Sequence, residues 1–429
     1  MAERVRFTRE DTELLTRVGP GTPMGELFRR YWIPALLSEE LPEPDCPPVR
    51  VRLLGEDMLA FRDSNGRVGL IDPHCAHRGA NLFLGRNEHG GITCIYHGWM
   101  YDVEGRCLAQ PTEPPELSFK DEVRLKNYPC VDRGEVIWTY MGPPELVPEP
   151  PEFEWVNVAP EQRRVNKDLE QCSYLQAMEG GFDSAHLGFL HFGIDIAPGE
   201  NPVGAGGSRT QLRAILDDRS PYTEVIESDG GLFIANRRNA DDDHYYWRVN
   251  AFVLPFFQLI PASPRGIGGH AWVPLDDENC WVFNYSWHPT KPREKNSPSD
   301  RLERIPGTFI PVANKSNDYL IDRELQRTTV WSGIENIRVQ DIAVQESMGP
   351  IYDRSRENLG HTDVGIVALR RRLIEATRLV QEGKTPPGVQ PATQRIRSAS
   401  IYSAKDVLIK DIIWENTKSG PEAEFAPYG

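Results

Sequence analysis

Two short stretches of the chain each combine one cysteine with one histidine: Cys75-Ala-His77 and, after sixteen intervening residues, Cys94-Ile-Tyr-His97. Thiolates and imidazoles at such short spacings can bind zinc or an iron–sulfur cluster. Zinc fingers usually pair cysteine with cysteine and histidine with histidine, whereas here each stretch offers one of each. This pattern favours a [2Fe–2S] centre in which one iron binds both thiolates and the other binds both imidazoles.

A second group of metal-binding residue types lies in Asp183-Ser-Ala-His186-Leu-Gly-Phe-Leu-His191. Asp183 and His186 are three residues apart and are expected on one helix face. His191 lies too far round a regular helix to join them, so the helix should widen or end near Gly188. Two histidines and one carboxylate form the facial triad that holds a mononuclear iron(II). Spacing alone does not select the carboxylate among 63 acidic residues.

The cysteine–histidine motif lies in a region of short β-type runs. Between Val49 and Met141 the sequence contains runs such as Met58-Leu-Ala-Phe-Arg and Val136-Ile-Trp-Thr-Tyr. A small all-β domain is therefore expected, with the ligand loops at the tips of its hairpins. Five prolines between residues 142 and 151 mark its end, because proline fits neither a helix interior nor a central strand.

After these prolines the sequence mixes helices and strands, which predicts an α+β domain. Helices are predicted over about residues 169–190 and again between Ile366 and Val380, where apolar residues recur at helical spacing. Residues 10–38 also look helical. We expect a helical segment (1–40), a β domain (41–150) and an α+β domain (151–429), with the helical segment packed on the α+β domain. Strands are predicted at Thr223–Ile226, Leu232–Ala235, Tyr245–Ile260, His270–Pro274 and Cys280–Trp287.

Composition argues against several classes of protein. The 429 residues carry 48 lysines and arginines against 63 aspartates and glutamates, and the net charge of −15 disfavours nucleic acid or an anionic membrane as partner. The longest apolar run, residues 251–262, is too short to span a membrane, and no apolar signal region begins the sequence. Seven cysteines, an odd number, disfavour a disulfide framework and favour the cytoplasm.

The residues around both groups resemble those of the Rieske non-haem iron oxygenases that hydroxylate aromatic rings. Cys75-Ala-His77-Arg-Gly-Ala and Cys94-Ile-Tyr-His97-Gly-Trp are similar to the cluster-binding loops of this family's α (oxygenase) subunits. The resemblance implies that these four side chains hold one [2Fe–2S] Rieske cluster, toward which Tyr96 can donate a hydrogen bond. It also implies an α+β chain: a Rieske-type all-β domain followed by a helix-grip (START-like) α+β catalytic domain.

The resemblance also assigns roles within the second group. It implies that His186 and His191 bind one mononuclear Fe(II), while Asp183 bridges a catalytic histidine to a Rieske histidine of the neighbouring subunit. The third ligand would be Asp341, because residues 336–348 resemble the late helix that supplies an aspartate in the family. Nearby acidic rivals are Glu335, Glu346 and Asp353. A head-to-tail homotrimer, or stacked trimers, is therefore expected.

The family's chemistry requires a partner that supplies electrons. Glu179, followed by glycine, favours the phthalate 4,5-dioxygenase-like branch, whose reductases usually carry FMN and a plant-type [2Fe–2S] cluster. The resemblance implies that such a reductase passes electrons from NADH to this chain. The flavin would belong to the partner, because no glycine-rich nucleotide loop follows a strand in this sequence.

The substrate is expected to be an aromatic compound that reacts with O₂, and a carboxylated one, similar to phthalate or benzoate, is favoured. Arg237 and Arg248 lie in strand regions, and a cationic side chain in an apolar strand needs an anionic partner. Internal salt bridges remain an equally good interpretation. The products would be a cis-dihydrodiol or a phenol, and oxidative O- or N-demethylation is the alternative within the family. From other classes, a zinc-stabilised binding protein or a Rieske electron carrier with a non-catalytic appendage remains open.

Overall fold

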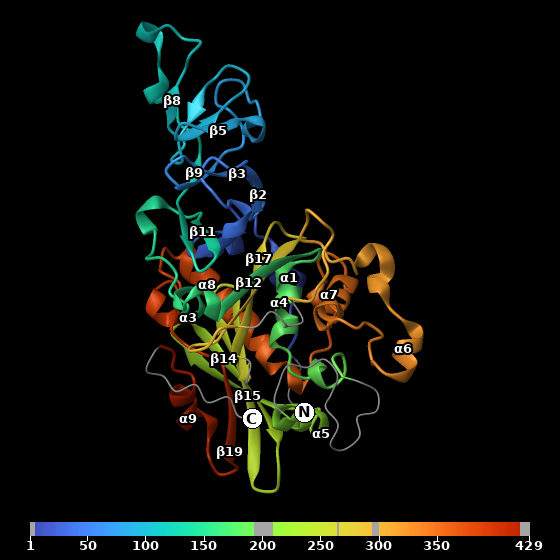
Figure 1. Ribbon diagram of the computed structural model, residues 1–429. Coiled ribbons are helices and arrows are strands. Elements are labelled where there is room, and N and C mark those ends of the chain that lie inside the picture. The colour runs from blue at the N-terminus through green and yellow to red at the C-terminus, as the bar shows by residue number, and fades with distance from the viewer. Residues whose placement is uncertain (1–4, 193–208, 264–265, 294–299, 421–429) are drawn as a thin grey trace.

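The computed structural model describes residues 5–192, 209–263, 266–293 and 300–420 (Figure 1). Two helices come first, α1 (Arg9–Thr16) and α2 (Pro23–Phe28). The prediction of helix up to residue 38 is wrong at its end, because Trp32–Leu37 is strand β1 and pairs with β11 (Val136–Tyr140). β1 is buried along its whole length, and a short continuous apolar run fits a buried strand as well as a helix.

The all-β prediction for the following region is confirmed. It contains two four-stranded antiparallel sheets, ordered β2-β3-β4-β9 and β5-β6-β7-β8, and a smaller sheet β1-β11-β10. The sheet β5-β6-β7-β8 lies at the top of Figure 1. Apolar residues around Cys75 and Cys94 form a hydrophobic cluster of their own. The strands are β2 (Val49–Leu53), β3 (Glu56–Arg62), β4 (Val68–Ile71), β5 (Arg86–Glu88), β6 (Gly91–Thr93), β7 (Met100–Tyr101), β8 (Cys107–Ala109), β9 (Asn127–Tyr128) and β10 (Cys130–Arg133).

The second domain is built on an eight-stranded antiparallel sheet. The strand order is β12-β18-β17-β16-β15-β14-β13, and β19 pairs with β15 beside β16. The predicted run Tyr245–Ile260 is two strands joined by a turn at residues 254–256, where Pro255 has no N–H to donate to the ladder. The strands are β12 (Arg163–Glu170), β13 (Tyr222–Ser228), β14 (Gly231–Asn239), β15 (His244–Val253), β16 (Phe257–Ser263), β17 (Gly266–Pro274), β18 (Cys280–Trp287) and β19 (Ala399–Ala404).

Helices cover this sheet, which confirms the α+β fold class. Helix α4 (Tyr174–Phe182) packs on β17, α7 (Ile337–Ser347) packs on α4, and the predicted late helix α8 (Val364–Gln381) packs on β13 and β14. The shorter helices are α3 (Glu154–Asn157), α5 (Arg209–Asp217), α6 (Arg323–Thr328) and α9 (Ile409–Asn416). No helix among the described residues combines the length and the apolar character needed to cross a membrane. The domain boundaries at residues 40 and 150 stay predictions.

The helix predicted over residues 169–190 is shorter in the structure. It ends at Phe182, and only a 3₁₀ turn (His186–Gly188) follows, so Asp183 and His186 do not share a helix face as predicted. The Asp183 carboxylate accepts the backbone N–H of Ala185 at 2.7 Å. Such local side-chain bonds compete with helical bonding, and two glycines just before Asp183 weaken the helix further.

Candidate functional site

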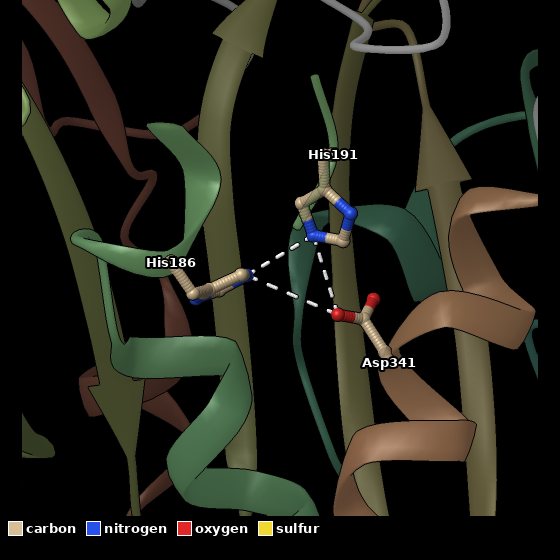
Figure 2. Close-up of side chains that lie close together, drawn as sticks. All are labelled: His186, His191 and Asp341. Atoms are coloured by element: carbon tan, nitrogen blue, oxygen red, sulfur yellow. Dashed lines mark hydrogen bonds and ion pairs between the residues drawn. The ribbon is translucent and has the colours of Figure 1, made fainter. Parts of the chain in front are cut away.

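His186, His191 and Asp341 converge from two parts of the chain that are far apart in sequence (Figure 2). His186 and His191 follow α4, whereas Asp341 lies in the second turn of α7. His191 Nε2 lies 3.0 Å from His186 Nε2 and 3.2 Å from Asp341 Oδ1, and His186 Nε2 lies 3.8 Å from the same oxygen. The packing of α7 on α4 brings these three side chains together.

A hydrogen bond orients the imidazole of His191, and a nearby carboxylate faces the imidazole of His186. The Gln340 amide donates to the carbonyl of Ile334 at 2.6 Å, which turns its Oε1 toward His191 Nδ1 at 2.8 Å. In the neutral ring the proton of His191 is therefore on Nδ1, and the lone pair of Nε2 faces the other two residues. On His186, Nδ1 lies 3.5 Å from a carboxylate oxygen of Asp183, so this ring also presents Nε2 to the group.

The three facing atoms suit a bound cation. Burial alone would raise the pKa of Asp341, but His191, His186 and Arg338 outweigh it and hold the pKa at about 2. Metal binding requires both imidazoles to be neutral, and an ionised carboxylate and two imidazole lone pairs then face one point. With metal–ligand bonds of about 2.1 Å, neighbouring ligand atoms of an octahedron lie about 3.0 Å apart, close to two of the three separations. Two histidines and one carboxylate are the donor set of mononuclear iron(II) sites.

A cavity of about 250 Å³ adjoins this group. Its wall includes the inner face of the sheet, because Arg248, Gln258 and His270 come from β15, β16 and β17. Apolar residues such as Leu187, Phe192, Leu212, Ile215, Ile260 and Trp272 make up much of the rest. A larger hollow of about 900 Å³, between β13 and α8, is lined by none of the candidate ligands. The smaller cavity is therefore the candidate substrate site.

The two arginines predicted to bind substrate lie on opposite faces of the sheet. Arg248 lines the cavity, and it makes no hydrogen bond or ion pair with the described parts of the chain. Arg237 pairs with Trp247, the neighbour of Arg248, and side chains alternate between the two faces along a strand. Its guanidinium lies over the rings of Tyr222 and Tyr245, at 4.6 and 4.3 Å from their centroids. Arg237 therefore does not line this cavity, contrary to the expectation from the sequence.

The cysteine–histidine motif forms two loops of the same construction. The carbonyls of Cys75 and Cys94 accept the N–H of the glycine four residues on, Gly79 at 2.8 Å and Gly98 at 2.9 Å. Each cysteine N–H also donates to the carbonyl five residues on. Both glycines have φ of +74°, a conformation that residues with a Cβ rarely adopt. The two tight turns present their cysteine and histidine side chains in equivalent ways.

The thiols of these loops point inward and the imidazoles lie nearer the surface. Cys75 and Cys94 are buried, and burial together with the nearby Cys75 raises the pKa of Cys94. The rings of His77 and His97 lie together, with centroids 4.5 Å apart. His77 Nδ1 is buried and has no hydrogen-bond partner among the described residues. Paired thiols, paired imidazoles and an orphaned ring nitrogen fit a [2Fe–2S] cluster held by thiolates on one iron and imidazoles on the other.

The tyrosine whose hydroxyl contacts a cysteine of the cluster motif is Tyr101. The expectation that Tyr96 donates this hydrogen bond is wrong. Tyr96 is exposed, whereas the hydroxyl of buried Tyr101 lies 3.2 Å from Cys75 Sγ. The same oxygen accepts the N–H of Ala76 at 3.1 Å, which leaves its proton for the sulfur. Burial and the nearby thiol raise the pKa of Tyr101, so the hydroxyl keeps that proton.

Sequence reasoning missed three polar residues of the catalytic domain: Gln258, His270 and Gln340. Gln340 directly precedes Asp341, and its place beside a candidate ligand could have identified it from the sequence. Gln258 and His270 are polar residues within largely buried strands, where burial of a polar group is costly unless it is bonded. Gln258 and His270 lie directly opposite each other on β16 and β17, and this pairing could not be predicted without the strand register.

Comparison with known proteins agrees with this geometry. Residues 31–129 match the Rieske [2Fe-2S] domain and residues 139–426 match the family described as LigXa C-terminal domain like. The 3-chlorobenzoate-3,4-dioxygenase oxygenase subunit of Comamonas testosteroni is 39% identical, over 95% of this chain and 96% of the relative. The phthalate 4,5-dioxygenase oxygenase subunit of Pseudomonas putida is 34% identical, over 96% and 94%.

More distant relatives share the architecture. The 5,5'-dehydrodivanillate O-demethylase oxygenase subunit of a Sphingobium species is 32% identical, over 89% of this chain and 83% of the relative. The crystal structure of dicamba monooxygenase bound to dicamba superposes with a TM-score of 0.55 at 19% identity, over 82% of this chain and 98% of that one, which shows the same fold.

These matches favour an oxygenase over the zinc-stabilised binding protein and over the electron carrier. The relatives are named as oxygenase subunits. Both domains match along nearly the whole sequence, and the residues present fit both metal groups. The chain belongs to the Rieske non-haem iron oxygenases, as an α (oxygenase) subunit with one [2Fe–2S] cluster and one mononuclear iron.

Proposed function

We propose that this terminal oxygenase inserts O₂-derived oxygen into a carboxylated aromatic compound, similar to benzoate or phthalate, with electrons from NADH. The observation that carries the proposal is Arg248. Its cationic side chain lines the cavity next to the His/His/Asp group and has no anionic partner in the described parts of the chain. A guanidinium recognises a carboxylate with two parallel hydrogen bonds, so a substrate carboxylate would complete the site.

The side chains of the two metal groups would divide the work as follows. His186, His191 and Asp341 would hold the mononuclear iron, and Cys75, His77, Cys94 and His97 would hold the cluster. The iron supplies open coordination positions for O₂ beside the substrate. Gln340 fixes the ring of His191, Arg248 orients the carboxylate, and the apolar wall excludes water from the reacting ring.

Asp183 would connect this site to the cluster of a neighbouring subunit. It touches His186, and its side chain is still 31% exposed. In Figure 1 the loops beside β5 lie at one end of the molecule and α4 with α7 lie well below them. A head-to-tail homotrimer, or stacked trimers, would bring the half-buried imidazole end of one subunit's cluster to Asp183 of the next, since a heterologous interface whose rotation closes forms a ring.

The reductase partner would be an NADH-dependent protein with FMN and a plant-type [2Fe–2S] cluster. Glu179, which favoured this branch in the sequence, lies in α4 and binds two arginines, Arg354 and Arg370. The relatives named as phthalate and 3-chlorobenzoate dioxygenase subunits support the same branch. The chain would work in the cytoplasm, where NADH is available.

The test is O₂ uptake coupled to NADH and a reductase, over a panel of benzoates, phthalates, aryl methyl ethers and neutral aromatic analogues, with product analysis. We expect uptake with at least one carboxylated ring and a dihydrodiol or phenol as product. His186→Ala is the control, because it should lose the mononuclear iron and O₂ uptake while the visible Rieske spectrum persists. Oxidation of neutral rings only would reject the aromatic-acid proposal.

Oxidative O-demethylation is the second candidate, and the relative named as a 5,5'-dehydrodivanillate O-demethylase subunit favours it. The same panel separates the two reactions. A demethylase releases formaldehyde in proportion to the O₂ consumed and leaves a phenol, whereas a ring dioxygenase releases none.

A further inference from the structure

Four polar side chains lie in one row across the catalytic sheet. Gln258, His270, Asn284 and Asn166 face one another directly on β16, β17, β18 and β12. Directly opposed residues project from the same face of an antiparallel sheet, so the row lies on the face that lines the cavity. Buried polar groups cost free energy unless they are bonded, and an apolar row would serve the fold equally well. We therefore expect this polar row to have a function beyond the stability of the fold.

The bonding direction along this row is set by Asp168. This fully buried carboxylate accepts from Arg304 Nε at 2.7 Å and from Asn284 Nδ2 at 2.8 Å. A carboxylate paired with a guanidinium can only accept, so Asn284 must turn its NH₂ group toward Asp168. Its carbonyl oxygen then faces His270 Nδ1 at 2.8 Å. His270 must therefore carry its proton on Nδ1 and donate it to Asn284.

The other nitrogen of His270 is left as an acceptor. Nε2 makes no hydrogen bond with the described residues, and His270 lines the cavity. Burial and, to a smaller extent, the charge of Arg338 lower the pKa of His270 to about 3, so the ring is neutral in the working pH range. A neutral imidazole with Nδ1 protonated presents a lone pair at Nε2, and it cannot rotate this nitrogen away without breaking the bond to Asn284.

Arg248 and His270 lie on the same face of the sheet. Every second residue of β15 lies on one face, so Arg248 shares its face with Asn250 and Phe252. Phe252 lies directly opposite Gln258 on β16, and Gln258 lies directly opposite His270 on β17. The cavity thus has a cationic donor on β15 and a neutral acceptor on β17, two strands away. A donor and an acceptor on one wall of the cavity favour an aromatic ring with two polar substituents, one that accepts a hydrogen bond and one that donates.

We propose that His270 Nε2 accepts a hydrogen bond from a hydroxyl or amino substituent of the substrate, which makes the preferred substrate a hydroxylated or aminated aromatic acid. This inference rests on the proposed function, in which Arg248 binds the carboxylate. His270 is thereby a specificity residue: it favours rings with a donor group, because a ring without one leaves Nε2 in the cavity wall unpaired.

The test compares dissociation constants, measured calorimetrically with the metal-loaded protein, for benzoate, 3-hydroxybenzoate and 4-hydroxybenzoate. The methyl esters of the three acids are measured in the same series. We expect one hydroxybenzoate to bind about 5- to 10-fold more tightly than benzoate, as one hydrogen bond allows. His270→Phe should abolish this ratio. His361→Phe, at an exposed histidine bonded to Ser220, is the matched control and should keep the ratio.

A second variant, His270→Gln, separates a folding defect from loss of the acceptor. Its amide can still donate to Asn284 and can present an oxygen near the position of Nε2. It should retain part of the hydroxyl preference, whereas a purely structural role would give no such rescue. Two results overturn the proposal: an unchanged ratio in His270→Phe, or no hydroxylated ring, acid or ester, that the native protein binds more tightly than its parent. A His270-dependent preference among esters, with acids no better than esters, would instead reject the aromatic-acid function and leave His270 as the acceptor.

Discussion

Gln340 Oε1 lies 2.8 Å from His191 Nδ1 and accepts a hydrogen bond from it, so the residue that precedes Asp341 in the sequence orients the ring of His191. Such outer partners of metal-binding histidines typically contribute a factor of 10–100 in metal affinity. We expect Gln340→Leu to weaken Fe(II) binding by about 10- to 100-fold. Iron retained after dialysis against a chelator measures this, with the Rieske absorbance as internal reference. Gln326→Leu, on α6, is the control, and equal iron loss in both variants would contradict the role.

Asp183→Asn should keep both metal groups and lose most of the turnover. The amide keeps the size of the side chain but removes the charge that faces His186 at 3.5 Å. The loss should be about 10- to 100-fold in O₂ uptake. Metal analysis and single-turnover oxidation of the reduced cluster show whether the defect lies in transfer between the centres. Full activity of this variant would contradict the cross-subunit route.

Mixing experiments test the same route by a different measurement. A Cys75→Ser subunit should lack the cluster and an Asp183→Asn subunit should lack the bridge, and each alone should be nearly inactive. In a head-to-tail trimer, mixed subunits place a native cluster beside a native Asp183 at some interfaces. Activity should therefore return on co-assembly, and no recovery in verified mixed trimers would contradict transfer between subunits.

Much of the site could be predicted because its residue types are rare and closely spaced. The cysteine–histidine pairs each form one loop, and His186 and His191 follow one helix, so local spacing carried the information. Asp341 needed the resemblance to known proteins, because it meets the histidines only through the packing of α7 on α4. Long-range packing of this kind leaves no trace in local spacing.

The errors in the sequence interpretation arose where two physical effects compete. Trp32–Leu37 is uniformly apolar, so its pattern could not separate a buried strand from a helix. The helix before Asp183 ended early because a side-chain bond to Ala185 replaced a helical bond. Arg237 and Arg248 looked alike in sequence, yet their odd separation places them on opposite faces once β14 pairs with β15.

Arg248→Met should weaken the binding of carboxylated substrates far more than the binding of neutral ones. A charge-assisted hydrogen-bond pair is worth enough to change KM by about 10- to 100-fold, and neutral analogues never form it. Arg237→Met is the matched control, because that guanidinium lies over Tyr222 and Tyr245 on the other face. Steady-state kinetics on one acid and its methyl ester measures the effect. An unchanged ratio of the two KM values would remove Arg248 from the substrate site.

Tyr101→Phe should lower the reduction potential of the cluster without loss of its visible spectrum. The hydroxyl donates toward Cys75 Sγ at 3.2 Å, and hydrogen bonds to cluster sulfurs stabilise the reduced state. One such bond, at about 1 kcal/mol, corresponds to about 40 mV for a one-electron couple. Spectroscopic redox titration measures the shift. Tyr96→Phe is the control and should leave the potential unchanged, because Tyr96 is exposed; equal shifts in both variants would contradict the assignment.

Glu179→Gln should destabilise the protein, and the loss should depend on pH. Burial alone would raise the pKa of Glu179, but Arg354 and Arg370 outweigh it and lower the pKa below its ordinary value of 4.5. The stabilisation is therefore complete above pH 4.5 and is lost as the pH falls through the lower, folded-state value.

At pH 7 the variant should lose about 3 kcal/mol, because two buried guanidinium groups lose a charged partner, and the deficit should shrink in acid. The midpoint of denaturant unfolding at pH 7 and pH 4 measures both effects. Glu382→Gln removes an exposed carboxylate paired with Lys384 and should cost almost nothing at either pH. A deficit in Glu179→Gln that is the same at both pH values would show that lost packing, and not lost charge, accounts for the destabilisation.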